Sequence, residues 1–248
     1  MFGLFRKKPK APLRSPLDAK LIGVDIHSHL IAGIDDGAQT HEESLALVKG
    51  LKEFGFKSFW TSPHVMSDFY RNSSTTINEG AKKLNDILKK ENIDLPVHAA
   101  AEYYFDDFFF ELIEKNDLLP IRGEYLLFEF SYINQPEDPF PIIKKIKDLG
   151  YKPLLAHPER YPFYFYNHDL LKQLRESGVY FQININSLAG HYGPESMGVA
   201  HWMIDQNIVD FVGTDIHKET HLAVIERALC SEYLYKLVES GRLVNQSL

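Results

Sequence analysis

The chain has 248 residues, of which 44% are hydrophobic and 25% charged, as in an ordinary globular protein rather than a disordered or fibrous one. Its formal net charge of -7 argues against a nucleic acid partner, because phosphate backbones are bound by clustered Lys and Arg. The single cysteine, Cys230, cannot form an intrachain disulfide, and no apolar run reaches the roughly 18 residues of a membrane span, so we expect a cytoplasmic protein.

The first residues are expected to form a lead-in outside the folded domain. Residues 1–19 contain a basic run at 6–10 and no apolar segment of signal-peptide length. We expect a flexible basic tail that is solvated, in preference to one that is attracted to a membrane surface. Residues 20–248 are expected to form a single domain.

The rest of the chain alternates short β-rich runs with longer segments of helical period, a pattern typical of α/β proteins. Thr40 and Glu43 have the form of a capping box ahead of an apolar helical face, and further helices are expected at 77–88, 142–149 and 222–233. A closed barrel and an open doubly wound sheet both fit this alternation, and periodicity does not choose between them. Seven strands are expected, at 20–26, 56–61, 96–101, 125–130, 153–156, 179–185 and 208–213.

Ionisable side chains stand at the ends of these strands, at the edge where α/β folds build their sites. Alternation along the first strand turns His27 and His29 to one side, where two imidazoles can hold a metal ion. Asp36 follows in a glycine-flanked loop, either as a ligand or as part of a plain Asx turn. Glu102 comes directly after an apolar run and needs a cation if it is buried. The other candidates are His64, Glu129, His157, Asp215 and His217.

Oxygen and imidazole ligands without a thiolate suit Zn, Mn or Fe, and this set is larger than one tetrahedral ion uses. We therefore expect two or three divalent ions as cofactors, with Mn favoured. Neighbouring ions lower the pKa of a bound water toward about 7 and stabilise the attacking and leaving oxygens of a phosphoester. The expected reaction is in-line hydrolysis of a phosphomonoester without a covalent enzyme intermediate.

The order of the motifs resembles the polymerase and histidinol phosphatase (PHP) superfamily from about residue 22 to 220. Within that superfamily, residues 25–37 and 156–161 are similar to the bacterial tyrosine phosphatases of capsule and exopolysaccharide synthesis. The resemblance implies a distorted seven-stranded β/α barrel with its metals at the carboxyl-terminal mouth. It also implies a phosphotyrosine protein as substrate, such as a bacterial tyrosine kinase or a regulator of polysaccharide assembly, and leaves a homo-oligomer open. The motifs that carry it are H-x-H, D-D-G, S-P-H, A-E, F-E-F, A-H-P-E-R-Y and D-x-H.

By motif position, the resemblance implies three sets of metal ligands, with Glu102 bridging the first two ions. The sets are His27, His29, Glu102 and Asp215 for the first ion, Glu102, Glu129 and His157 for the second, and Asp36, His64 and His217 for the third.

The resemblance further implies catalytic roles for Arg160, Asp215 and His217, with Arg160 gripping the phosphate as a bidentate donor. A surface salt bridge between Arg160 and its neighbour Glu159 is the plainer alternative. The family often has another arginine shortly after D-x-H. In this chain Lys218 and His221 are the candidates to take its place, and we expect Lys218 to bind substrate.

Aromatic residues crowd two stretches that follow ligand-bearing strands, at 103–110 and 161–166. Tyr103 and Tyr161 are the expected stacking partners of a phosphotyrosine ring, and packing of helices on the barrel is the alternative. No catalytic role is expected for His41, His98, His168, His191, His201 and His221.

Three other functions compete with this interpretation. A cysteine-nucleophile phosphatase needs an arginine six positions after the cysteine, but Lys236 stands there after Cys230. A small-molecule phosphatase of the same superfamily, acting for example on histidinol phosphate, has the same metal ligands. A non-catalytic module that binds phosphorylated partners through its metals is the third.

Overall fold

The computed structural model describes residues 14–248, in which parallel strands and surrounding helices alternate along the chain. The strands are β1 (Val24–Asp25), β2 (Ser58–Thr61), β3 (His64–Val65), β4 (Val97–Ala99), β5 (Glu102–Tyr104), β6 (Tyr125–Glu129), β7 (Lys152–Ala156), β8 (Tyr180–Asn184) and β9 (Phe211–Gly213). The helices are α1 (His41–Phe54), α2 (Ser74–Lys90), α3 (Asp107–Lys115), α4 (Phe140–Asp148), α5 (Asp169–Glu176), α6 (Pro194–Asp205), α7 (Leu222–Ala228) and α8 (Glu232–Glu239). No helix in this part of the chain is long and apolar enough to cross a membrane.

The strands form a closed, irregular ring. One sheet has the order β1-β2-β4 and the other β3-β5-β6-β7-β8-β9, with parallel neighbours throughout. A parallel bridge between Ser28 and Ile216 joins the continuations of β1 and β9, where the His29 amide donates to the Ile216 carbonyl over 3.0 Å. This ring confirms the predicted α/β class and distorted barrel, and it excludes the open doubly wound sheet.

Two of the seven predicted strands are each broken into two pieces. The strand predicted at 56–61 continues, after Ser62 and Pro63, as β3, and the one predicted at 96–101 continues as β5. Pro63 has no amide to donate to a ladder, so the pairing is interrupted there. Its carbonyl still accepts from the Glu102 amide over 3.1 Å, which keeps the two second pieces in register.

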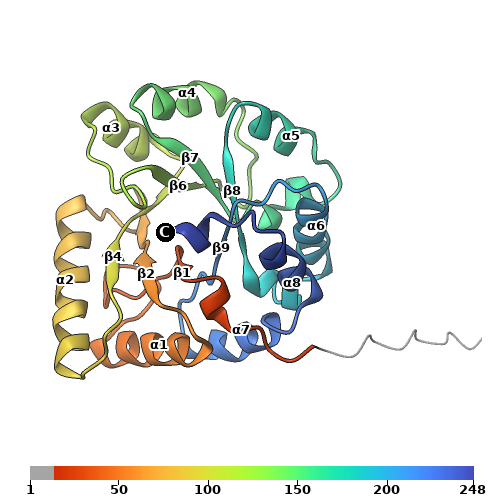
Figure 1. The fold of residues 1–248 in the computed structure, drawn as a ribbon. Helices are drawn as coiled ribbons and strands as arrows, with labels where there is room; N and C mark the ends of the chain where they lie inside the picture. Colours follow the sequence, from red (N-terminus) through yellow and green to blue (C-terminus); the bar gives the residue numbers. More distant parts are fainter. Residues whose placement is uncertain (1–13) are drawn as a thin grey trace, which may run out of the picture.

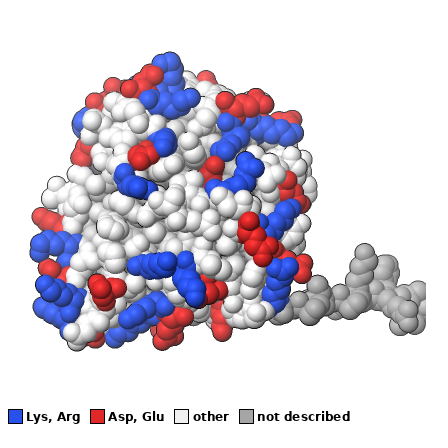
Figure 2. Space-filling view, viewed as in Figure 1, with Lys and Arg blue, Asp and Glu red and all other residues white. Residues whose placement is uncertain are grey.

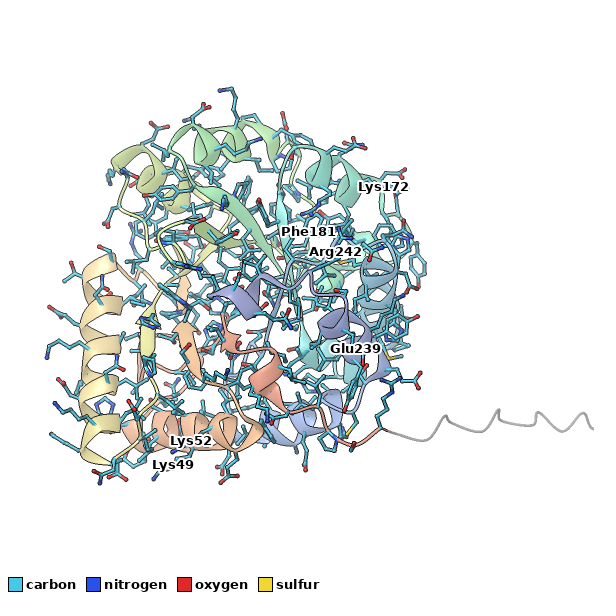
Figure 3. The ribbon with its side chains drawn as sticks, viewed as in Figure 1. Lys49, Lys52, Lys172, Phe181, Glu239 and Arg242 are labelled. Atoms are coloured by element: carbon cyan, nitrogen blue, oxygen red, sulfur yellow. The ribbon has the colours of Figure 1, made fainter. Side chains whose placement is uncertain are left out.

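The first helix follows the predicted capping pattern. The Thr40 side chain accepts from the Glu43 amide, and α1 ends at Gly55 with φ 107, a conformation that glycine adopts without steric cost. Leu47 and Leu51 on the inner face are buried against the barrel. In Figure 1 the helices α1 to α7 surround the strands. In Figure 3 Lys49 and Lys52 of α1 lie at the outer edge, while Phe181 of β8 lies inside.

Two of the predicted boundaries at the chain ends are wrong. The segment predicted as one helix at 222–233 is two helices, because residues 229–231 leave the helix and the extended Ser231, with ψ 129, is the N-cap of α8. Of the strand predicted at 20–26, only Val24–Asp25 (β1) forms a strand. A 3-10 helix at Ala19–Leu21 precedes it. Leu17 is buried and its amide donates to the Leu229 carbonyl, so the last residues of the predicted flexible lead-in belong to the fold. Residues 1–13 of that lead-in lie outside the described residues.

The C-terminal segment closes the amino-terminal end of the barrel, where the strands begin. The Asn245 side chain, in the 3-10 helix η6 (Val244–Ser247), donates to the carbonyls of Val24 and Val212 over 2.9 and 2.8 Å and accepts from the Val212 amide. The C-terminus accordingly lies near the centre of the ring in Figure 1. The opposite end, where the strands finish, remains for the functional site.

Candidate metal centre

All nine predicted ligands meet at the carboxyl-terminal mouth of the barrel. His27 and His29 follow β1, Glu129 ends β6, His157 follows β7, and the loop after β9 brings Asp215 and its neighbour His217. His64 and Glu102 begin the second pieces of their broken strands, which sets both side chains inside the mouth rather than at its edge. Four overlapping groups of ligand atoms, each within 4.8 Å of one another, contain all nine residues: His27, His29, Asp36, His64, Glu102, Glu129, His157, Asp215 and His217.

The first group joins His27, His29 and Asp215. The Nε2 atoms of the two histidines lie 3.5 and 3.4 Å from Asp215 Oδ1. His27 Nε2 is also 3.3 Å from Glu102 Oε2, so Glu102 lies at the boundary of this group. All four side chains are buried.

Glu102 faces the second group with its other oxygen. Its Oε1 atom is 2.9 Å from His157 Nε2, and His157 Nε2 is 3.9 Å from Glu129 Oε2. One carboxylate thus presents an oxygen to each of two neighbouring groups. This is the arrangement that a bridging ligand needs.

A third group gathers around Asp36, whose Oδ1 atom is 3.4 Å from both His64 Nε2 and His217 Nε2. His64 reaches the second group as well, because its Nδ1 atom lies 3.0 Å from Glu102 Oε2 and 3.1 Å from Glu129 Oε1. His29 belongs to the first and third groups. The four groups overlap the three implied sets without reproducing them. Glu102 is grouped with His27 and His157 in one place and with His64 and Glu129 in another, so Glu129 and His157 fall in separate groups.

The donor atoms fit divalent cations better than they fit one another. His64 Nδ1 and Glu102 Oε2 are buried without a hydrogen-bond partner among residues 14–248, although they lie only 3.0 Å apart. Buried polar atoms left without partners are costly, and native proteins keep them where a ligand completes them. Imidazole and carboxylate donors without thiolate suit Mn, Fe or Zn.

The pKa values show how strongly the site favours charge. Burial disfavours the imidazolium of His29, but the charge of Asp35 and a hydrogen bond to Asp215 outweigh it and raise the pKa to about 10. Burial likewise opposes ionisation of Asp215, yet the charges of His27 and His217 hold its pKa well below the usual range. A hydrogen bond to His217 lowers the pKa of Asp36 to about 2. Such a field attracts cations, which displace protons from the imidazoles when they bind.

Each of three histidines is oriented by a hydrogen bond to its second ring nitrogen. His27 Nδ1 lies 2.8 Å from Gln182 Oε1, His29 Nδ1 lies 2.7 Å from Asp35 Oδ2, and His217 Nδ1 lies 3.0 Å from the Asp215 carbonyl. With Nδ1 as donor, Nε2 is left as the ligand atom that faces the site. Asp35 also accepts from the amides of Gly37 and His64, so it fixes the loop that carries Asp36.

Sequence reasoning missed Asp35 and Gln182 as supporting residues. The only signal for Asp35 was its place beside Asp36 in a glycine-flanked loop, where either carboxylate could have been the ligand. Gln182 stands within β8, on a strand that carries no predicted ligand. Because β8 pairs with β9, and the closing bridge between Ser28 and Ile216 places the continuation of β1 beside β9, Gln182 comes next to His27.

Glu159 supports the site from within the protein and is not a surface partner of Arg160. It is fully buried, and its Oε1 atom accepts from the Asn184 amide and the Ser187 hydroxyl over 2.8 and 2.6 Å. Asn184 in turn donates to Asp215 Oδ2 over 2.6 Å. The alternative of a surface salt bridge between Glu159 and Arg160 is therefore wrong.

Arg160 enters the mouth beside the metal ligands. Its Nη1 atom donates to Asp215 Oδ2 over 2.7 Å, which is the single hydrogen bond of its guanidinium within residues 14–248. The guanidinium lies 4.9 Å from the ring centroid of Tyr132 and 4.2 Å from that of Tyr192. These residues come from the loops after β6 and β8, which flank the loop after β7 that carries Arg160. The remaining N–H donors are left for a ligand.

A cavity of about 550 Å³ opens above the ligand cluster. Lys218 and His221, the candidates for the second cation, both line it. Burial lowers the pKa of His221 to about 4, so this imidazole is neutral near pH 7, whereas Lys218 is an exposed side chain. The other lining residues are Asp36, His64, Met66, Phe69, Tyr70, Tyr104, Glu129, Tyr132, His157, Arg160, His191, Tyr192, Asp215 and His217.

The predicted aromatic substrate contacts are wrong. Tyr103 and Tyr161 are 2% and 0% exposed, and neither lines the cavity. The Tyr103 hydroxyl accepts from the Leu119 amide, and the Tyr161 hydroxyl donates to the Ala156 carbonyl. Both rings pack in the hydrophobic core, as the plainer alternative for these aromatic stretches proposed.

Comparisons with known proteins agree with this geometry. A family model described as "Capsular polysaccharide synthesis, CpsB/CapC" matches residues 23–243. The tyrosine-protein phosphatase YwqE of Bacillus subtilis is 30% identical over 91% of this chain and 93% of its own. The tyrosine-protein phosphatase CpsB of Streptococcus pneumoniae is 27% identical over 78% and 82%.

Two solved structures share the fold. A crystal structure described as YwqE from Bacillus subtilis and CpsB from Streptococcus pneumoniae, metal-dependent tyrosine phosphatases, aligns with a TM-score of 0.77 at 29% identity, covering 90% of this chain and 94% of that one. Histidinol phosphate phosphatase from Lactococcus lactis aligns with a TM-score of 0.54 at 11% identity, covering 83% and 94%, which shows a common fold only.

Proposed function

Because the chain belongs to the CpsB/CapC family of capsular polysaccharide synthesis proteins, we propose that it is a metal-dependent phosphatase that hydrolyses phosphotyrosine in proteins. The observation that carries the proposal is the convergence of nine candidate ligand side chains at the mouth, six of which line one cavity together with Arg160. A phosphomonoester needs a cationic cradle and an activated water, and this site has the residues for both. Two or three ions are proposed, with Mn favoured.

The metal ions, when bound, would supply an activated water and stabilise charge on the phosphoryl oxygens. The protein's own contribution begins with Arg160, whose unused N–H donors can grip two oxygens of the phosphate. Asp215 accepts from Arg160 and Asn184 on Oδ2, so it fixes the guanidinium, while Oδ1 faces the two histidines. His217 is held by its Nδ1 and directs Nε2 toward Asp36.

Lys218 is proposed as the second cation that meets the phosphate, in the place where the family often has an arginine. Among the residues that line the cavity, Arg160 and Lys218 are the one arginine and the one lysine. His221 does not fill this role because its imidazole is neutral near pH 7. A tyrosinate leaving group has a conjugate acid with a pKa near 10, so it departs with little help from a general acid.

The proposed partner is a phosphotyrosine protein, most simply a bacterial tyrosine kinase or a regulator of capsule or exopolysaccharide synthesis, acted on in the cytoplasm. Supporting this are the capsular description of the family and the names of the relatives. Residues 20–248 are proposed to act as one domain, which fits a ring of strands closed by the C-terminal segment.

The test is an assay of metal-reconstituted protein on a phosphotyrosine peptide, histidinol phosphate and p-nitrophenyl phosphate. We expect the two aryl phosphates to be preferred and His157→Ala to abolish the activity, since His157 contacts the bridging Glu102. Cys230→Ala is the matched control, because Cys230 lies between α7 and α8 and does not line the cavity. Activity that survives His157→Ala but is lost in Cys230→Ala would overturn the proposal, and preference for histidinol phosphate would favour the small-molecule phosphatase.

A further inference from the structure

One loop at the mouth presents aromatic side chains that the fold itself does not use. The loop follows β3, and its base is fixed by several hydrogen bonds. The Met66 amide donates to the Tyr70 carbonyl, the Ser67 amide donates to Asp106 Oδ2, and the Asn72 side chain donates to the carbonyls of Ile34 and His64. The tip of the loop is thus carried on an anchored base.

Phe69 stands at that tip with 76% of its surface exposed, yet it lines the cavity above the ligand cluster. Its nearest aromatic neighbour is Tyr70, with ring centroids 6.4 Å apart. Tyr70 lies nearly parallel to the imidazole of His64, at 5.8 Å and 15°. The three rings therefore form a row that runs outward from the metal ligands, in the order His64, Tyr70 and Phe69.

Several of the other aromatic side chains near the mouth have partners within the fold, while Tyr104 also lines the cavity. Phe105, Phe108 and Phe110 pack against the hydrophobic core, and Phe109 is fully buried in it. Tyr132 and Tyr192 contact the guanidinium of Arg160. An exposed phenyl ring with no such partner, at the edge of a functional cavity, is the kind of apolar surface that a ligand covers.

Arg160 is placed on the other side of the mouth. Arg160 follows β7, which is separated from β3 in the ring by β5 and β6 on one side and by β8, β9 and β1 on the other. A phosphate held between the ligand cluster and Arg160 therefore has its ester oxygen free to point toward the loop after β3. An aryl group on that oxygen would lie along Tyr70 and Phe69.

We propose that Tyr70 and Phe69 form the subsite for the aryl group of the substrate, so that they select aryl over alkyl phosphates. The inference rests on the proposed phosphatase function and deepens it. Tyr70 provides a ring face next to the metal ligands, and Phe69 covers the outer part of the aryl group. Aromatic pairs of this kind contribute enough to separate ligands that differ only in the ring.

The test uses phosphonates, which bind but are not hydrolysed, and compares phenylphosphonate with methylphosphonate on the metal-loaded protein by calorimetry. We expect Phe69→Ala to raise the Kd of phenylphosphonate about 2- to 10-fold and to leave that of methylphosphonate unchanged. Phe69→Tyr, which keeps the ring, should bind both ligands as the unaltered protein does. The KM for p-nitrophenyl phosphate should rise in Phe69→Ala by the same factor as the Kd of phenylphosphonate.

Tyr166→Ala is the matched control, because Tyr166 is an 88% exposed aromatic residue that follows β7 without lining the cavity. Equal weakening of both phosphonates in Phe69→Ala, no weakening of either, or the same selective weakening in Tyr166→Ala would each overturn the subsite. The proposed function fails separately, if the unaltered protein does not hydrolyse a phosphotyrosine peptide. The phosphonate comparison still decides the subsite in that case.

Discussion

The two ends of the barrel differ in whether their buried polar atoms have hydrogen-bond partners. At the amino-terminal end, the Asn245 side chain is 1% exposed and makes three hydrogen bonds to the main chain of Val24 and Val212. At the carboxyl-terminal mouth, His64 Nδ1 and Glu102 Oε2 are equally inaccessible but have no hydrogen-bond partner in the described chain. Figure 2 shows the face on which the C-terminus lies, with mostly uncharged atoms at its centre and charged residues toward its margin.

This difference separates polar groups that stabilise the fold from those that serve the reaction. A buried amide with all its hydrogen bonds contributes to stability, while buried ionisable groups without partners lower it unless a ligand completes them. Proteins keep such local violations mainly at functional sites. Changes at the mouth should therefore alter activity and metal binding, and changes at the opposite end should alter stability.

The largest effect is expected from Glu102→Gln at the mouth. Gln keeps the size of the side chain but removes the charge that faces His27, His64 and His157. We expect kcat/KM for p-nitrophenyl phosphate to fall about 10³-fold or more, since several kcal/mol of charge stabilisation depend on the bridged ions. Glu124→Gln, an exposed glutamate paired with Lys152, is the control and should stay within about 2-fold. A Glu102→Gln protein with a tenth of the normal activity would contradict the bridging role.

Asp35→Asn should weaken metal binding without removing a ligand. The charge of Asp35 orients His29 through Nδ1, and loss of such a supporting contact reduces metal affinity about 10- to 100-fold. The measurement is the chelator concentration that inactivates half of the protein, compared with Asp169→Asn on the surface of α5. An unchanged concentration would show that Asp35 is not needed to orient His29.

Asn245→Ala tests the opposite end. It leaves the carbonyl of Val24 and the amide and carbonyl of Val212 without their side-chain partner. We expect the free energy of unfolding of the metal-loaded protein to fall by about 1–3 kcal/mol, with the activity of the folded protein unchanged. Asn78→Ala on the exposed face of α2 is the control and should change the free energy of unfolding by less than about 0.5 kcal/mol. Loss of activity in Asn245→Ala with an unchanged free energy of unfolding would contradict the claim that the amino-terminal end serves stability alone.

The smallest effect is expected from Tyr192→Leu, which removes one ring from the guanidinium of Arg160. The inhibition constant of inorganic phosphate should rise about 2- to 5-fold, the size of a modest cation–π contact, while Tyr192→Phe keeps the normal value. In an Arg160→Met background, Tyr192→Leu should change nothing further. An equal change in both backgrounds would mean that Tyr192 does not act through Arg160.

The sequence predicts that the candidate ligands converge because most of them stand at or just after the end of a strand, and parallel strands end at one edge. That these side chains bind metal stays a prediction. Supporting residues are harder to predict, since Gln182 and Asn184 reach the site only through contacts between strands that are distant in sequence. Aromatic substrate contacts fail for another reason. Composition marks where aromatic residues gather, but it does not reveal which side of a strand or loop faces the core, so Tyr103 was predicted and Phe69 was missed.

The broken strands could not be predicted from periodicity either. The apolar runs at 56–61 and 96–101 indicate strands, but the second pieces at His64 and Glu102 are too short for any periodic signal. They exist because neighbouring strands offer partners, as in the pairing of His64 with Glu102. These short pieces set two of the metal ligands deep in the mouth.

The most direct test of the account measures bound metal and activity on the same protein. The protein would be stripped with a chelator, reloaded with Mn, Fe or Zn, and followed by elemental analysis together with hydrolysis of a phosphotyrosine peptide. We predict two or three ions per chain in the active protein, with activity lost on stripping and recovered on reloading. Full activity in protein that holds fewer than one ion per chain would contradict the central claim.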